Sequence, residues 1–146
     1  VVDTMLRVKL TAWVRAMEVG GSPLRFDVAV PWVWGGDFLS RNYEALLPYR
    51  EKGAHMPVEW AMNLVKGAMS HDISGNLATI EAPTLVIVGE EDVLTPPGLS
   101  RFIAEQVPHG ELYIMPNRGH AAALEDVAGF CTLVLDFFSR VETREE

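Results

Sequence analysis

An acid and an imidazole follow the two most strand-like segments of this sequence. Asp92 closes a short acidic run directly after the apolar residues 84–89, and His120 comes soon after a second apolar run at residues 111–115. In open parallel sheets, ligand sites lie beyond the carboxyl ends of the strands. Because adjacent strands are about 4.8 Å apart, side chains that follow two neighbouring strands can meet. The spacing therefore predicts that Asp92 and His120 lie together at one end of a sheet.

Such a pair suits the transfer of a proton. A carboxylate bonded to the ring N–H of a histidine fixes the tautomer of the imidazole and stabilises the imidazolium that forms when the ring takes a proton. Gly119, directly before the histidine, lets the backbone turn sharply and present the ring. Each residue alone is an ordinary surface side chain. Their shared position after two neighbouring strands is what indicates a functional site.

The second half of the chain has the pattern of a parallel α/β unit. Residues 84–89 form an apolar, largely β-branched run without polar alternation, as expected of a parallel strand that is covered on both faces. The amphipathic residues 98–107 predict a helix, residues 111–115 predict a second strand, and residues 125–139 predict a long final helix. The order strand, helix, strand, helix is typical of a parallel sheet.

The first half of the chain is helical in pattern. Apolar residues recur at spacings of three and four, on one helical face, at Leu6, Leu10, Trp13, Val14 and Met17. A pair of glycines predicts the end of this helix. Residues 22–30 predict a second short helix closed by Pro31, with a strand at residues 26–30 as the alternative. Further helices are predicted at residues 37–52 and 57–69.

The predicted strands are too few for a complete sheet. The two runs hold 11 of the 146 residues, whereas about 20–25% of a globular domain is strand. Two parallel strands do not make a stable sheet alone, and the apolar residues 84–89 need neighbours along their hydrogen-bonding edge. We therefore expect the remaining strands to come from outside this chain.

The order of these features resembles the C-terminal part of the α/β-hydrolase family. From Leu77 to Asp92 the sequence reads L-x-x-I-x-x-P-T-L-V-I-x-G-x-x-D, which is similar to the approach to the family's penultimate strand and the acid that follows it. The helix, strand, Gly-His pair and final helix continue the likeness over residues 77–140. The resemblance implies a partial α/β-hydrolase fold, with Asp92 as the acid of a catalytic triad and His120 as its general base.

The same resemblance implies two regions. Residues 1–76, with several short helices that contain Trp and Phe, look like the helical lid, or cap, that these enzymes insert before the penultimate strand. Residues 77–146 look like the C-terminal part of the hydrolase core. The N-terminal half of the fold, which carries the nucleophile, has no counterpart here. We therefore expect this chain to be a fragment or a subunit of a hydrolase.

No residue of this chain fits the family's nucleophile. The family places the nucleophile before the acid, at a Gly-x-Ser-x-Gly turn between a strand and a helix. Ser22 comes nearest, but Leu24 stands where the second glycine belongs and no strand precedes it. Ser100 also lacks the second glycine, and it lies after Asp92. Because the nucleophile and the oxyanion loop are both missing, we predict that the chain alone is inactive.

Three functions are compatible with these features. The first is part of a serine-type hydrolase, of the esterase or lactonase class, that cleaves small apolar esters or lactones through an acyl-enzyme. The second is a non-catalytic oligomerising or interaction module derived from a hydrolase. The third is a dehalogenase-type hydrolase whose nucleophile is an Asp in the missing half.

A small apolar molecule is the expected substrate. Trp32, Trp34 and Leu94 are the candidate substrate-binding residues, although aromatic residues at helical spacing also fit a core. The expected partner is either a second copy of the chain or an N-terminal hydrolase half that completes the sheet. No cofactor and no metal are expected, because no His-x-x-x-His or carboxylate cluster has metal-ligand spacing.

Composition limits which partners and which cell compartment we expect for this protein. The formal net charge of −8 argues against nucleic acid or an anionic membrane as a partner. No apolar run approaches the roughly 18 residues of a membrane helix. The first residues also lack the layout of a signal peptide, so we expect a cytoplasmic protein. Cys131, the only cysteine, excludes an intramolecular disulfide and is expected to be buried in the final helix.

Overall fold

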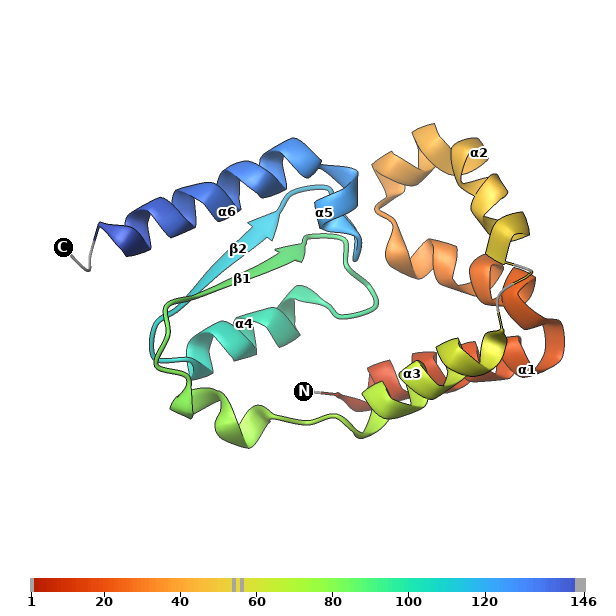
Figure 1. The fold of residues 1–146 in the computed structure, drawn as a ribbon, viewed down its shortest axis with the longest axis horizontal. Coiled ribbons are helices and arrows are strands. Elements are labelled where there is room, and N and C mark those ends of the chain that lie inside the picture. Colours follow the sequence, from red (N-terminus) through yellow and green to blue (C-terminus); the bar gives the residue numbers. More distant parts are fainter. Residues whose placement is uncertain (1, 54, 56, 144–146) are drawn as a thin grey trace.

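The structure of the chain is a computed structural model that describes residues 2–53, 55 and 57–143. Figure 1 shows a helical segment that leads into a small sheet with helices on both sides. In chain order the elements are α1 (Thr4–Val33), α2 (Gly36–Gly53), α3 (Val58–Ser70), the 3₁₀ helix η1 (Ser74–Thr79), β1 (Thr84–Gly89), α4 (Pro97–Gln106), β2 (Gly110–Met115), α5 (Ala122–Glu125) and α6 (Val127–Glu142).

The sheet consists of β1 and β2, which pair in parallel. The register runs from Thr84 opposite Gly110 to Gly89 opposite Met115, so both strands end at the same level. Helix α4 connects the two strands and packs against both, and α6 lies on the other side of the sheet (Figure 1). The predicted strand, helix, strand, helix order and the α/β class are confirmed. Two short elements were not predicted: η1, which precedes β1, and α5, which lies between β2 and α6.

Helix α1 is longer than predicted but contains the predicted break. It continues through Gly21, whose φ of 62° and ψ of −153° are not helical and produce a kink. Such a φ suits glycine, which has no Cβ to clash. The strand alternative for residues 26–30 is wrong, because this stretch is helical. Pro31 does not close the helix: the Trp34 N–H still donates to the Val30 carbonyl at 3.3 Å, so the last turn forms around the proline.

The main hydrophobic core joins α1 and α3 to the loop after β1. Apolar side chains on one face of α1 pack with α3 and with the loop after β1, in a cluster of Leu6, Leu10, Val14, Met17, Val65 and Leu94. Helix α1 is capped by the Asp3 carboxylate, which accepts a hydrogen bond from the Leu6 N–H at 2.7 Å. The Lys9 ammonium donates to the Val93 carbonyl in the loop after β1. These contacts anchor the helical segment at the carboxyl end of the sheet.

One face of α6 is apolar and open. Val127, Leu135 and Phe138 are all exposed, while Phe137 on the other side of the helix is buried. The expectation that Cys131 is buried is wrong, because this residue lies in the same open part of α6. Nothing among the described residues covers this face. None of the helices that the structure describes has the length and hydropathy of a membrane span.

Candidate functional site

The loops that follow β1 and β2 stay hydrogen-bonded beyond the strands. The Glu90 N–H donates to the Met115 carbonyl at 2.9 Å, and the Glu91 N–H donates to the Arg118 carbonyl at 2.8 Å. The two loops therefore leave the sheet side by side. This pairing brings Asp92, in the loop after β1, close to His120, in the loop after β2.

Asp92 and His120 meet at this end of the sheet. The Oδ2 atom of Asp92 lies 2.9 Å from the Nδ1 atom of His120. The two side chains differ in exposure: that of Asp92 is 4% exposed and that of His120 is 39% exposed. The structure thus places a buried carboxylate behind a partly exposed imidazole ring. In such an arrangement a carboxylate orients the imidazole and stabilises its charged form.

Both oxygens of Asp92 are held by the residues that follow it. Oδ1 accepts the Leu94 N–H at 2.9 Å and the Thr95 N–H at 2.8 Å. Oδ2 accepts the Thr95 hydroxyl at 2.9 Å. Burial raises the pKa of Asp92, but the hydrogen bonds from His120 and Thr95 outweigh it and leave the pKa below its ordinary value. The carboxylate is therefore ionised at neutral pH.

Thr95 contacts both members of the pair, a role that the sequence pattern did not predict. Its Oγ1 atom donates to Asp92 and lies 3.1 Å from Nδ1 of His120. The signal that could have found it is local. An Asp followed three residues later by Thr often closes a turn through its own side chain. Here that turn also brings the hydroxyl to the imidazole.

The geometry defines which ring nitrogen of His120 is free to act. Because Nδ1 faces the Asp92 carboxylate, the neutral ring carries its proton on Nδ1 and its lone pair on Nε2. Nε2 has no hydrogen-bond partner within the part of the chain that the structure describes. A partly exposed, unengaged Nε2 can accept a proton from a group that comes within hydrogen-bonding distance of it.

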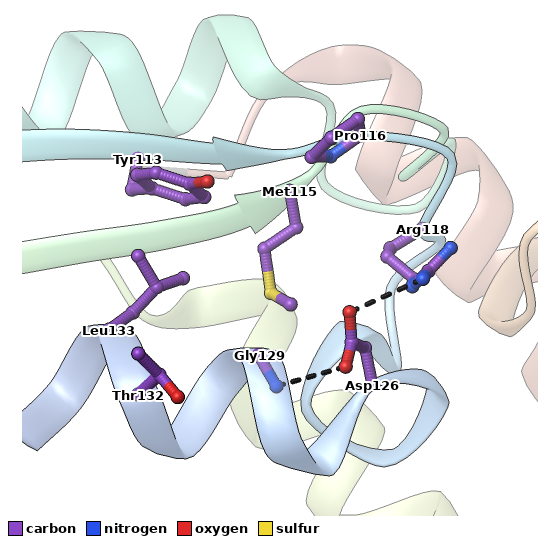
Figure 2. Close-up of a pocket in the computed structure, with 8 residues that line it drawn as sticks. All are labelled: Tyr113, Met115, Pro116, Arg118, Asp126, Gly129, Thr132 and Leu133. Atoms are coloured by element: carbon purple, nitrogen blue, oxygen red, sulfur yellow. Dashed lines mark hydrogen bonds and ion pairs between the residues drawn. The ribbon is translucent and has the colours of Figure 1, made fainter.

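The loop that carries His120 is anchored to the start of α6. Arg118 Nη2 lies 3.2 Å from Asp126 Oδ2, and Asp126 Oδ1 accepts the Gly129 N–H at 2.9 Å (Figure 2). The Gly129 N–H and the Arg118 guanidinium hold the pKa of Asp126 below its usual value. A cavity of about 360 Å³ lies beside this anchor, between β2 and α6. Tyr113 and Leu133 line opposite walls of it.

The three candidate substrate-binding residues fall in two places. Leu94 is buried in the main core, and Trp32 packs against that same cluster. Trp34 instead stacks on Phe38, with ring centroids 4.8 Å apart, and lines a different cavity of about 580 Å³ that Leu124 also lines. Their role in substrate binding stays a prediction.

The serines that came nearest to the nucleophile motif lie in helices. Ser22 is buried in α1, and Ser100 belongs to α4. Within the described residues, the side-chain hydrogen bonds of His120 go to Asp92 and Thr95, and neither serine is among its partners. The described residues of the candidate site are therefore a carboxylate, an imidazole and a hydroxyl.

Several proteins of similar sequence carry the name of a hydrolase. The chain is 37% identical over 89 residues to a protein of Variovorax paradoxus named "Putative carbamate hydrolase RutD", a match that covers 60% of this chain and 34% of the relative. It is 28% identical over 146 residues to the protein of the same name from Serratia proteamaculans, covering 98% of this chain and 50% of the relative. The chain thus spans between about a third and a half of these curated relatives. No protein-family model matches it.

Solved structures of similar fold are also α/β-hydrolases. MGS-M2, an α/β-hydrolase from a deep-sea metagenome library of the Medee basin, superimposes with a TM-score of 0.81 at 28% identity, over 94% of this chain and 52% of that protein. The enol-lactonase of Burkholderia xenovorans superimposes with a TM-score of 0.77 at 20% identity, over 89% of this chain and 50% of the enzyme.

Proposed function

Because this chain has the fold of the C-terminal half of an α/β-hydrolase, we propose that it supplies the acid and the base of a hydrolase catalytic triad. The observation that carries this proposal is the 2.9 Å contact between Asp92 Oδ2 and His120 Nδ1, which leaves Nε2 unengaged. Asp92 orients and stabilises His120, and His120 is the general base.

The nucleophile comes from outside this chain. The sequence has no Gly-x-Ser-x-Gly turn, and the chain covers about half of its structural neighbours. The apolar face of α6 and the two-stranded sheet suit a partner that adds strands and buries this surface. An N-terminal hydrolase half fits both needs, because it brings strands together with the nucleophile and the oxyanion donors. The chain alone is then inactive.

The proposed substrate is a small apolar ester or lactone. Nε2 of His120 takes the proton of a serine hydroxyl as its oxygen attacks the substrate carbonyl carbon. When the tetrahedral intermediate collapses, the alkoxide leaves and receives that proton from His120. Water then attacks the acyl-enzyme in the same way and releases the acid. Two similar proteins are named as a putative carbamate hydrolase and as an enol-lactonase. Both names describe reactions in which a carbonyl carbon is attacked.

The test compares the chain alone with the assembly purified through a tag on it, using a chromogenic short-chain ester. We expect the chain alone to be inactive and the assembly to hydrolyse the ester. His120→Ala should lower kcat of the assembly by about 10³-fold or more. His109→Ala, an exposed histidine in the turn before β2, is the matched control and should leave kcat unchanged.

A serine-reactive phosphonate locates the nucleophile. We expect this chain to remain unlabelled and the other polypeptide of the assembly to be labelled. Labelling of Ser22 or Ser100 would contradict an external nucleophile. An active assembly without any labelled serine would favour the dehalogenase-type Asp nucleophile. Activity of the assembly that survives His120→Ala would favour the interaction module.

A further inference from the structure

The backbone that joins α1 to α2 lies tightly against the loop that carries His120. The Ala121 N–H donates to the Val33 carbonyl at 2.9 Å. A Cβ added at Gly119 would strike the backbone of Gly35 and Val33, and one added at Gly35 would strike the Gly119 nitrogen. The two backbones therefore approach within the space that one side chain would fill. This contact joins the helical segment to the residue directly before His120.

A single carboxylate oxygen bridges these two backbones. Oε1 of Glu125 accepts the Gly35 N–H at 3.0 Å and the Gly119 N–H at 3.1 Å. Glu125 is the last residue of α5, five positions after His120. Because one oxygen accepts from both N–H groups, it ties the two backbones to each other.

The second oxygen of Glu125 has no such role. Oε2 is buried and lacks a hydrogen-bond partner among the residues described. Leaving a carboxylate oxygen in that state costs free energy. The two bonds through Oε1 are therefore the interactions that account for the position of this side chain.

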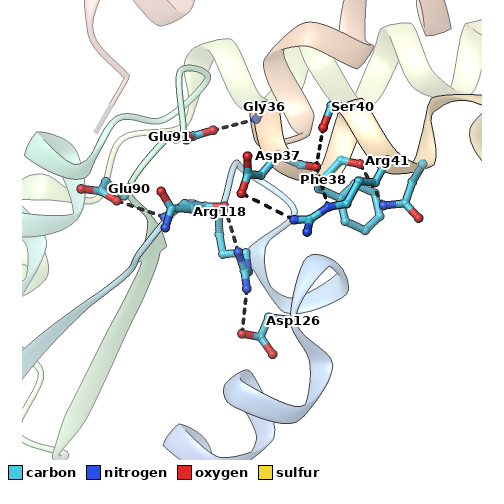
Figure 3. A network of polar contacts seen from close by, with 11 residues as sticks. Gly36, Asp37, Phe38, Ser40, Arg41, Glu90, Glu91, Arg118 and Asp126 are labelled. Carbon is cyan, nitrogen blue, oxygen red and sulfur yellow. Dashed lines mark hydrogen bonds and ion pairs between the residues drawn. The ribbon is translucent and has the colours of Figure 1, made fainter.

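The acid of the pair is tied to the same junction. Glu91, the residue before Asp92, accepts the Gly36 N–H through Oε2 at 2.7 Å, where α2 begins. Figure 3 shows Glu91 reaching from the loop after β1 to Gly36. Carboxylates close in sequence to both members of the pair thus contact adjacent peptide groups of one junction.

We propose that Glu125 is a positioning residue for His120, and that it fixes the loop of the base against the α1–α2 junction. The inference rests on the proposed function for its catalytic consequence, since the described hydrogen bonds of Glu125 go to Gly35 and Gly119 and it acts on His120 through Gly119. Movement of the helical segment at residues 33–36 is then transmitted to the imidazole.

Amide hydrogen exchange of the chain tests this bridge without any need for catalysis. Glu125→Ala removes the acceptor, so the Gly35 and Gly119 amides should exchange about 10-fold faster or more, because each amide loses its hydrogen bond; a 10-fold change corresponds to about 1.4 kcal/mol. The His120 ring resonances should shift or broaden as well. Glu125→Gln keeps an Oε1 acceptor and should retain slow exchange at both amides.

Two further variants keep the test decisive. Glu125→Asp preserves the charge but shortens the side chain by one methylene, so it should lose protection at one or both amides even if Glu125→Ala fails to fold. Glu105→Ala removes an exposed carboxylate from α4 and should change neither amide. Unchanged exchange in both Glu125→Ala and Glu125→Asp would overturn the proposal. So would a Glu125→Gln variant as impaired as Glu125→Ala.

Activity of the assembly then separates the two proposals. Loss of Glu125 should lower kcat by about 10²-fold, the size of effect expected for a misplaced catalytic group, with a smaller change in KM, and Glu125→Gln should restore most of it. If the bridge is present by exchange but no variant of the assembly hydrolyses esters, the proposed function fails while the structural bridge stands.

Discussion

At the scale of residues, the candidate site depends on the hydrogen bonds that one buried carboxylate accepts. Asp92 receives hydrogen bonds from two backbone N–H groups, one hydroxyl and one imidazole. This set keeps the buried carboxylate ionised and fixes its direction toward His120. The hydroxyl of Thr95 is the member with the least obvious role, because it contacts the acid and the base together.

Removal of the Thr95 hydroxyl should weaken the base without disturbing the shape of the site. Thr95→Val keeps the volume and takes one charged hydrogen bond from Asp92, which is worth about 1.5–3 kcal/mol. We expect kcat of the assembly to fall about 10-fold with KM little changed, as measured with the chromogenic ester. Thr95→Ser should recover the rate. A Thr95→Val enzyme with full activity would contradict the role of this hydroxyl.

The ionised state of Asp92 predicts a pH dependence of folding. Burial acts to raise its pKa, yet the bonds from His120 and Thr95 hold the pKa below the ordinary value. A depressed folded-state pKa contributes stability above the unfolded pKa of about 3.9, and this contribution is lost as pH falls through the folded value. The free energy of unfolding in urea should therefore fall more steeply below about pH 5 for the wild type than for Asp92→Asn. Equal slopes of unfolding free energy against pH for the two proteins would contradict a lowered pKa of Asp92.

At the scale of elements, glycines decide where backbone can bend or approach. The kink of α1 lies at Gly21 with a φ of 62°. Gly67 in α3 has ordinary helical surroundings and open space around it. The same substitution should thus act in opposite directions at the two positions.

Gly21→Ala should destabilise the chain by about 1–2 kcal/mol, because an alanine Cβ is strained at that backbone conformation. Gly67→Ala should stabilise it by about 0.5–1 kcal/mol, since alanine is the better helix former. Thermal unfolding followed by circular dichroism measures both. Equal effects of the two substitutions would show that the kink is not needed for folding.

At the scale of the whole molecule, the chain leaves apolar surface uncovered. Leu135 is 65% exposed and Phe138 is 56% exposed on α6, and the described sheet has two strands. Open strand edges and large apolar patches favour association. The same surfaces suit either a second copy or a hydrolase half.

The chain alone should form dimers or larger species at low concentration. Sedimentation velocity measures this directly. The double variant Leu135→Lys and Phe138→Lys should shift the distribution toward monomer, because a charged helix face is not easily buried. Val19→Lys, at an exposed site on α1, is the control and should change nothing. A folded wild-type monomer would show that these surfaces need no partner.

The sequence pattern was sufficient to predict features that depend on residues close together in the chain. The period of apolar residues identified both strands and most helices, and the chain order of the two strand ends placed Asp92 and His120 together. The turn of α1 at Gly21 was also visible, because glycine marks a conformation that other residues avoid. The burial of Cys131 was wrong, because periodicity shows that a helix face is apolar but not whether anything covers it.

The order of elements and the meeting of Asp92 and His120 at one end of the sheet follow from the sequence by itself, because strand period and strand-end position are properties of short segments. Only the tertiary structure decided which groups hold that pair. Thr95 reaches the imidazole through a turn, and Glu125 joins Gly35 to Gly119 across the fold. Contacts between residues far apart in the chain depend on how the elements pack, and no local pattern of residue types encodes that packing.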